Sequence, residues 1–211
     1  MNLISYLTNI YGYDTPIFLK DVRIGGKSKS AIKEEFYRAV KSGKIERKIK
    51  GVYFIRSNDE FGSGIIFDDI LDKRFLYSKN IDEELKELYV EGYYSGLTFL
   101  NIIGMSQQVP AVIEITTNRC SSKKYIYKKL GRTAIIRKAR TTINFMNYKM
   151  LQFLDMFYFV SLNEVKKNKD LLCKYIKQNK LNKNQFKEYI KLYSDQTLKK
   201  IVEGGIINAF I

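Results

Sequence analysis

The 211-residue chain contains no histidine. This absence excludes histidine acid/base catalysis, Ser–His and Cys–His nucleophiles, and histidine-containing metal sites. Only two cysteines occur, Cys120 and Cys173, without the CxxC spacing of metal-binding or redox pairs. Two isolated thiols fit a reducing compartment, so we expect a cytoplasmic protein. With no convergent carboxylate set either, we predict that the chain is not an enzyme and needs no cofactor.

Long apolar runs are also missing. No stretch approaches the roughly 18 to 20 residues that span a bilayer, and the N-terminus lacks the basic segment of a signal peptide. We therefore expect no membrane partner. Asp68, Asp69 and Asp72 are close in sequence, but without a calcium-loop pattern a solvated acidic turn is favoured over a metal site.

The formal net charge of +15 is distributed in zones. Residues 1–57 carry 12 basic and 5 acidic side chains, residues 58–118 carry 4 and 11, and residues 119–211 carry 21 and 6. DNA phosphate would account for the first zone. The last zone needs a second anionic surface, either nucleic acid or an acidic protein. The alternative is an AT-rich genome, whose lysine codons raise the basic content without function.

The most informative segment is 27–56. Apolar residues at i, i+4, i+7 and i+8 from Ile32 to Val40 form one face of a helix, and Gly43 is expected to end it in a left-handed conformation. Alternation from Ile45 to Ile49, a turn at Lys50-Gly51 and a second apolar strand predict a hairpin. A helix followed by a basic hairpin is typical of a winged helix-turn-helix, whose helix enters the major groove of DNA.

Two further helices are predicted before this segment, over Leu3–Ile10 and over Ile17–Val22 after Pro16. The sequence therefore predicts a winged helix-turn-helix domain over residues 1–57; the alternative is a small three-helix domain that binds protein. The expected core is Leu3, Leu7, Ile10, Phe18, Val22, Ile32, Phe36, Val40, Ile45, Val52 and Phe54. The expected contacts to double-stranded operator DNA are Lys27, Ser28, Lys29, Ser30, Lys33, Tyr37, Lys41, Arg47, Lys48 and Lys50.

A polar segment over 57–64 is expected to link this domain to a second, mixed α/β domain over residues 62–211. There the pattern predicts helices near 82–91 and 95–103, a buried strand at 112–116, and weaker strands at 125–127 and 134–136. From about residue 148 the chain is expected to be helical, with helices near 163–179, 182–193 and 195–203. The fold class predicted is thus α+β.

Basic residues cluster in the second domain. These are Lys123, Lys124, Lys128, Lys129, Arg132, Arg137, Lys138 and Arg140. If they lie on adjacent strands, they form one surface able to hold RNA, DNA or an acidic protein face. The arginines among them suit bidentate recognition better than lysine.

One block of the sequence resembles a known family. It comprises Gly92–Thr98 (GYYSGLT), Asn101, Gly104, Ser106–Pro110 (SQQVP) and Glu114–Asn118 (EITTN). This block is similar to the segment that opens the antitoxin domain of AbiEi-type antitoxins of type IV toxin–antitoxin systems, and Gly51–Phe54 resembles the motif that closes their winged helix. Met105 stands where that family pattern has leucine. The similarity in architecture covers roughly residues 1–160.

The resemblance implies an antitoxin that represses its own operon and counteracts a nucleotidyltransferase-like toxin, with or without direct contact. On this hypothesis the second basic cluster would serve neutralisation. Two other classes stay open. One is a transcription regulator whose second domain senses a ligand or oligomerises, and the other is a nucleic-acid enzyme with a DNA-binding domain.

Overall fold

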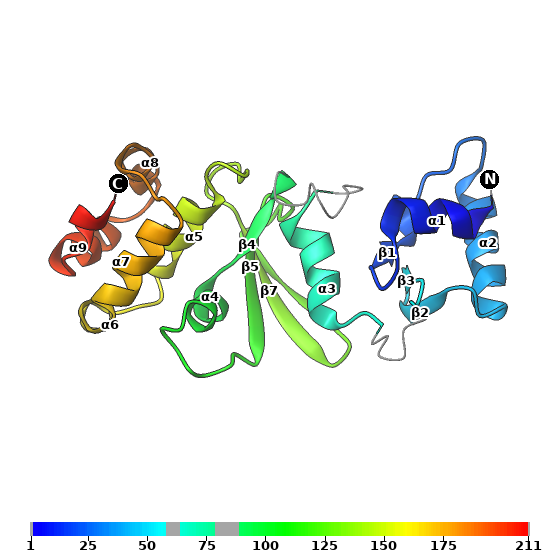
Figure 1. The fold of residues 1–211 in the computed structure, drawn as a ribbon, viewed down its shortest axis with the longest axis horizontal. Coiled ribbons are helices and arrows are strands. Elements are labelled where there is room, and N and C mark those ends of the chain that lie inside the picture. Colours follow the sequence, from blue (N-terminus) through cyan, green and yellow to red (C-terminus); the bar gives the residue numbers. More distant parts are fainter. Residues whose placement is uncertain (1, 58–63, 79–88, 211) are drawn as a thin grey trace. The chain divides into compact units, whose positions relative to one another are not determined.

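The computed structural model describes residues 2–57, 64–78 and 89–210 and has a mixed α+β fold with two separate sheets (Figure 1). It divides into two compact units, residues 1–86 and 87–211. The linker expected at 57–64 and the helix expected near 82–91 fall largely outside the described residues. Residues 64–78 belong to the first unit, although the sequence analysis places them in the second domain.

The first unit combines short helices with a small antiparallel sheet of order β1–β3–β2. Its elements are α1 (Leu3–Tyr11), β1 (Ile17–Phe18), the 3-10 turn η1 (Leu19–Asp21), α2 (Lys29–Lys41), β2 (Glu46–Ile49), β3 (Val52–Phe54), α3 (Phe67–Leu71) and the π-helical turn η2 (Asp72–Leu76).

Local sequence explains the predicted helix α2. Ser28 caps its first turn by accepting a hydrogen bond from the Ala31 N–H at 3.2 Å. Ile32 and Phe36 are buried along the expected face. Gly43 follows the helix with φ +71°, the left-handed conformation that was predicted. The hairpin of β2 and β3 is also confirmed.

The helix predicted over Ile17–Val22 is wrong. Ile17 and Phe18 form strand β1, which pairs antiparallel with Tyr53 and Val52 of β3. Both side chains are buried, and pairing with β3 joins this segment to the small sheet, where an apolar pair of this kind fits as well as in a helix. Only the turn η1 remains helical.

Two apolar clusters hold the first unit together. One packs α1 and α2 over Ile17, Val22 and Ile45, and the other joins Phe18, Val52 and Phe54 to Ile65 and Ile70. The second cluster ties the segment after the hairpin to the small sheet. Of the expected core residues, Ile10 is 40% exposed and Val40 is partly buried, while the other nine are buried.

The second unit contains a four-stranded mixed sheet of order β4–β5–β7–β6. Its strands are β4 (Gly92–Tyr94), β5 (Val112–Thr117), β6 (Lys124–Lys129) and β7 (Arg132–Lys138). The central strands β5 and β7 are parallel, and β6 is an antiparallel edge strand. Leu130 and Gly131 join β6 to β7 with φ of +53° and +71°, as the tight turn of a hairpin requires.

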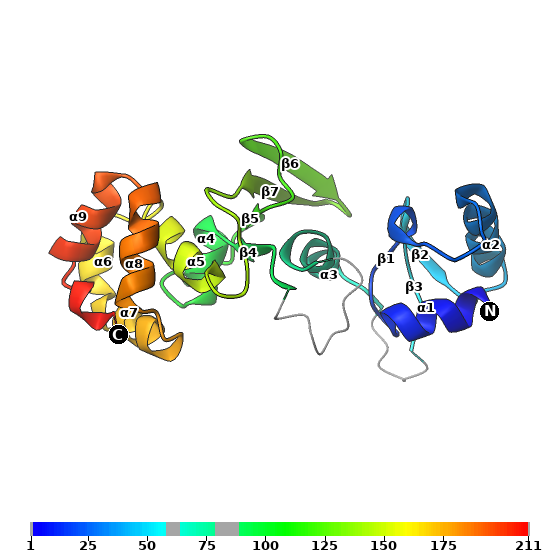
Figure 2. The ribbon, with the colours of Figure 1, turned by 90° about the horizontal axis from the view of Figure 1, so that it is seen from above.

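Helices cover part of this sheet and form a separate layer. They are α4 (Gly96–Ile102), α5 (Tyr148–Met156), α6 (Leu162–Lys167), α7 (Lys169–Gln178), α8 (Lys183–Tyr189) and α9 (Asp195–Glu203), with the 3-10 turns η4 (Ile190–Leu192) and η5 (Ile207–Ala209). Helix α5 lies between the sheet and α6–α9 (Figures 1 and 2). The one helix expected near 163–179 is divided at Asn168, whose φ of −104° and ψ of +20° interrupt it.

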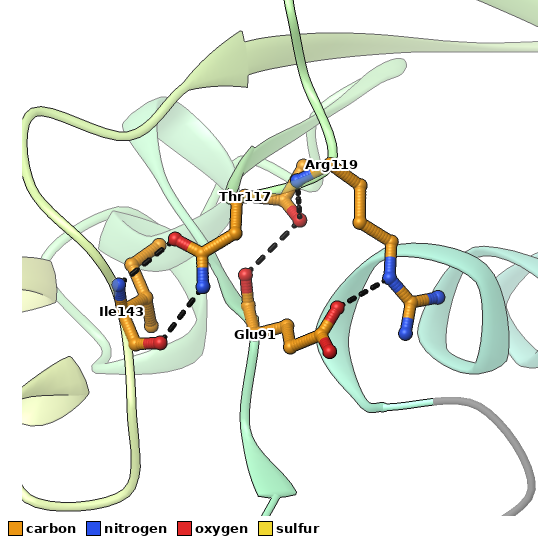
Figure 3. A network of polar contacts seen from close by, with 5 residues as sticks. Glu91, Thr117, Arg119 and Ile143 are labelled. Atoms are coloured by element: carbon orange, nitrogen blue, oxygen red, sulfur yellow. Dashed lines mark hydrogen bonds and ion pairs between the residues drawn. The ribbon is translucent and has the colours of Figure 1, made fainter.

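Thr117 and Asn118, the last two residues of the motif block, lie in a polar network at the end of β5 (Figure 3). The Asn118 amide donates to the carbonyl of Ile143 and accepts from its N–H, both at 2.8 Å. The Thr117 hydroxyl donates to the Glu91 carbonyl at 3.1 Å, and Arg119 forms an ion pair with the Glu91 carboxylate at 2.5 Å. These contacts tie the chain before β4 and the loop before α5 to the sheet.

Replacing Asn118 with alanine should therefore destabilise the second unit. Loss of the two hydrogen bonds to Ile143 should cost about 2 kcal/mol in the free energy of unfolding, measured by chemical denaturation followed by circular dichroism. Asn163→Ala, at an exposed position of α6, is the control and should change it by less than about 0.5 kcal/mol. Equal stability of the two variants would show that the Asn118 bridge contributes little.

Candidate nucleic-acid interface

The exposed face of α2 presents a stripe of polar side chains. Lys29, Lys33, Tyr37 and Lys41 recur every fourth residue, which places them along one side of the helix, and all four are exposed. Tyr37 is 64% exposed although it is aromatic. Ser30 lies beside this stripe and is exposed as well. A helix face with this chemistry can contact phosphates and base edges.

Two residues predicted to contact DNA have structural roles. The Lys27 ammonium pairs with the Glu35 carboxylate at 2.6 Å, with both side chains about a quarter exposed. Ser28 is the N-cap of α2, and its hydroxyl also lies 3.0 Å from that of Ser30. Both residues fix the start of α2, so their contribution to an interface would be to position Lys29 and Lys33.

The hairpin provides a second basic edge in the same unit. Arg47 and Lys50 are exposed, whereas Lys48 is half-buried. The pairing register with β3 shifts between Arg47 and Ile49, so Lys48 departs from the regular strand pattern. Lys44 lies exposed between α2 and β2 and was not among the expected contacts. Its position directly after Gly43, at the end of the predicted helix, could have placed it beside the other basic residues.

Packing fixes the hairpin against α2. The rings of Phe36 and Tyr53 meet edge to face with centroids 5.0 Å apart. Across the hairpin, Arg56 forms a bidentate ion pair with Glu46 at 2.5 and 3.0 Å. Hydrogen bonding to Arg56 lowers the pKa of the Glu46 carboxyl, so this pair persists at neutral pH. The basic residues of helix and hairpin therefore belong to one compact unit.

In the second unit, all eight residues of the predicted basic cluster lie on or next to the β6–β7 hairpin, which extends away from α5–α9 (Figure 2). They divide into two groups. Lys128, Lys129 and Arg132 lie at the turn end, and we name these three the hairpin tip. Lys123, Lys124, Arg137, Lys138 and Arg140 lie at the other end. Lysine on the edge strand β6 also opposes unwanted strand addition.

Arg137 and Arg140 are held by carboxylates. Arg137 donates to Glu114 through Nη2 at 2.6 Å and Nε at 3.1 Å, and the Glu114 side chain is only 9% exposed. The parallel register of β5 and β7 aligns Thr116 with Arg137 and so brings Arg137 beside Glu114. Replacing Arg137 would leave a buried carboxylate without its partner, which is strongly destabilising.

Arg140 belongs to a network centred on Asp155 of α5. Arg140 Nε lies 3.4 Å from Asp155 Oδ1, and the guanidinium lies 4.7 Å above the Tyr193 ring. The Tyr93 hydroxyl donates to Asp155 Oδ2 at 2.7 Å, and Thr116 donates to the same oxygen at 3.4 Å. Burial and the nearby Asp155 charge raise the pKa of Tyr93, so it remains a hydrogen-bond donor at neutral pH.

The part of the chain that the structure describes contains neither a group of three or more potential metal-ligating side chains nor a helix with the length and apolar character to cross a bilayer. The sequence matches no family model, and a search of the curated proteins finds no significant match.

Proposed function

We propose that the first unit is a winged helix-turn-helix that binds double-stranded operator DNA. The observation that carries this proposal is the order of its elements, in which α2 is followed by the β2–β3 hairpin and β1 completes the sheet as β1–β3–β2. On this proposal, α2 is the recognition helix and the hairpin is the wing. The wing would contact the backbone flanking the groove that α2 enters.

The arrangement of side chains supports this assignment. The stripe of Lys29, Lys33, Tyr37 and Lys41 would face DNA, while the opposite side of α2 packs Ile32 and Phe36 into the core. Arg47 and Lys50 would extend the contact to neighbouring phosphates. Each neutralised phosphate releases counterions and strengthens binding, which suits the net charge of +7 over residues 1–57.

We further propose that the chain is an antitoxin that represses its own operon and counteracts a nucleotidyltransferase-like toxin through its second unit. Support comes from the resemblance of the motif block, part of which, including Thr98 and Glu114, is buried in this unit. Thr98 accepts from the Glu114 N–H at 2.9 Å, and Asn101 donates to the Ser106 carbonyl at 3.1 Å. The block thus specifies a scaffold that presents the basic hairpin.

The second candidate is a transcription regulator whose second unit senses a ligand, without a toxin partner. It is favoured by an open cavity of about 780 Å³ beside the hairpin. Co-expression distinguishes the two proposals, because only an antitoxin rescues growth from a toxic nucleotidyltransferase-like protein encoded beside its gene.

The hairpin tip gives the sharper test of neutralisation. Changing Lys128, Lys129 and Arg132 to glutamine removes three exposed charges without breaking the ion pairs of Arg137 and Arg140. We expect growth rescue, counted as colonies under toxin induction, to fall about tenfold because the positive potential of the hairpin is reduced. DNA binding should stay within about twofold, since the substitutions lie in the other unit.

The matched control changes Lys183, Lys187 and Lys191, which are exposed lysines of α8 and η4, to glutamine. It removes the same charge from a different surface and should leave rescue intact. Full rescue by a stably folded hairpin-tip variant would remove the tip from the neutralisation surface and favour codon bias as the origin of these lysines.

A further inference from the structure

The open cavity in the second unit has an unusual lining. It lies where α5 ends beside strands β5 and β7, and five basic side chains line it with a single carboxylate, Asp155. Asp155 is already occupied by Tyr93, Thr116 and Arg140. The cavity therefore has a strong excess of positive charge that its own acidic residue does not neutralise.

Three of these basic residues are available to a ligand. Lys123, Lys124 and Lys138 are exposed, and within the described residues they form no ion pair. The ion pair of Arg137 uses Nε and Nη2, so its Nη1 group is not engaged in that pair. Ammonium and guanidinium groups are the side chains that bind phosphate oxygens.

Ser95 supplies an independent observation. It lines the cavity and is only 1% exposed, and its hydroxyl has no hydrogen-bond partner within the described residues. Its backbone N–H donates to the Glu114 carbonyl at 2.8 Å, which fixes the residue at this position. A buried hydroxyl without a partner is costly. In a cavity lined by cations, an anionic oxygen would satisfy it.

An aromatic surface lies at the same cavity. Tyr158, directly after α5, is 74% exposed, and its ring meets that of Phe159 edge to face at 5.5 Å between centroids. An exposed aromatic ring beside a basic groove is the arrangement on which nucleic-acid bases stack. The cavity volume of about 780 Å³ falls within the range of small-molecule sites.

We propose that this cavity is a nucleotide-binding site. The phosphates are held by Lys123, Lys124 and Lys138, a phosphate oxygen accepts from Ser95, and the base stacks on Tyr158. An acidic peptide would also meet the lysines, but it would offer no planar ring to Tyr158 and no phosphate oxygens to the ammonium groups. This site does not depend on whether the first unit binds DNA.

The same chemistry is offered by a free nucleotide or by the terminal nucleotide of a single strand. The probe is therefore N-methylanthraniloyl-ATP, bound to the full chain and followed by fluorescence anisotropy at about 0.15 M salt. Competition with ATP, with a single-stranded RNA pentanucleotide and with inorganic pyrophosphate separates the sources. ATP displaces the probe most strongly from a site for free nucleotides. The pentanucleotide displaces it most strongly from a site for the end of a strand.

Variants test each part of the site. Lys123, Lys124 and Lys138 changed together to glutamine should weaken binding at least about tenfold, whereas the hairpin-tip variant, with the same loss of charge, should change it less than about threefold. Tyr158→Ala should weaken binding about tenfold, and Tyr158→Phe should retain it because the ring is kept. Ser95→Ala should weaken it by several-fold without lowering thermal stability.

Three results would overturn the proposal. One is the absence of saturable binding of the probe to the folded wild-type chain. Another is equal weakening by the cavity and hairpin-tip variants, which would indicate general charge attraction. The third is displacement of the probe by an acidic peptide, but not by ATP or the pentanucleotide, which would assign the cavity to a protein partner.

Discussion

Replacing Lys29, Lys33 and Arg47 with alanine should weaken operator binding by the full chain about 100-fold at about 0.15 M salt, because three phosphate contacts are lost. The slope of the logarithm of the binding constant against the logarithm of salt concentration should fall in magnitude by about 0.9 for each contact. All three side chains are exposed and make no ion pair within the described residues, so the fold should be unaffected. Fluorescence anisotropy of a labelled duplex at several salt concentrations measures both quantities.

The control removes equal charge from the other unit. Lys166, Lys167 and Lys174 are exposed on α6 and α7, and changing them to alanine should leave the salt slope nearly unchanged. If the α2 and wing variant kept the wild-type affinity and slope, the DNA contact would have to lie on another surface.

The largest effect on stability is expected at Gly96. Its φ is +58°, and a Cβ atom at this position would lie 2.3 Å from a carboxylate oxygen of Glu114. Glu114 cannot move away freely, because Arg137 holds it in an ion pair at 2.6 Å. Gly96→Ala should therefore lower the free energy of unfolding of the second unit by about 3 kcal/mol, from backbone strain and overpacking together.

Gly104 provides the matched control for this substitution. It has φ +81°, but an added Cβ would meet no atom within 4 Å. Gly104→Ala should therefore lower the free energy of unfolding by only about 1 kcal/mol, from backbone strain alone. Denaturant unfolding followed by circular dichroism compares the two variants. Equal costs would show that the Glu114 carboxylate adjusts without loss and that close packing does not explain the glycine in the motif.

The sequence predicts those elements whose determinants are local. Helix α2 carries its own N-cap at Ser28, a buried face and a glycine after its end, so pattern alone located it. Ile17 and Phe18 were misassigned because an apolar pair fits a helix or a strand equally well. Their pairing with β3, more than 30 residues away in sequence, decided the outcome.

The cavity could not be located from the sequence. Ser95 and Lys138 reach it from distant parts of the chain, and the parallel pairing of β5 with β7 brings them together. The basic cluster was visible as composition, but the ion pair of Arg137 with Glu114 was not, since it depends on the register of two strands. The ion pair of Lys27 with Glu35 was not predicted either, because it joins a residue before α2 to a residue within that helix, eight positions away.

The most direct test of the central proposal is dimethyl sulfate interference on a duplex that carries the sequence upstream of this gene. The reagent methylates guanine N7, which lies in the major groove, where α2 is proposed to lie. We expect methylation at a few clustered guanines to abolish binding of the full chain. If two copies bind, the guanines between two separate clusters should be unaffected. Binding that no guanine methylation disturbs, on a duplex with guanines throughout the bound region, would contradict the proposal.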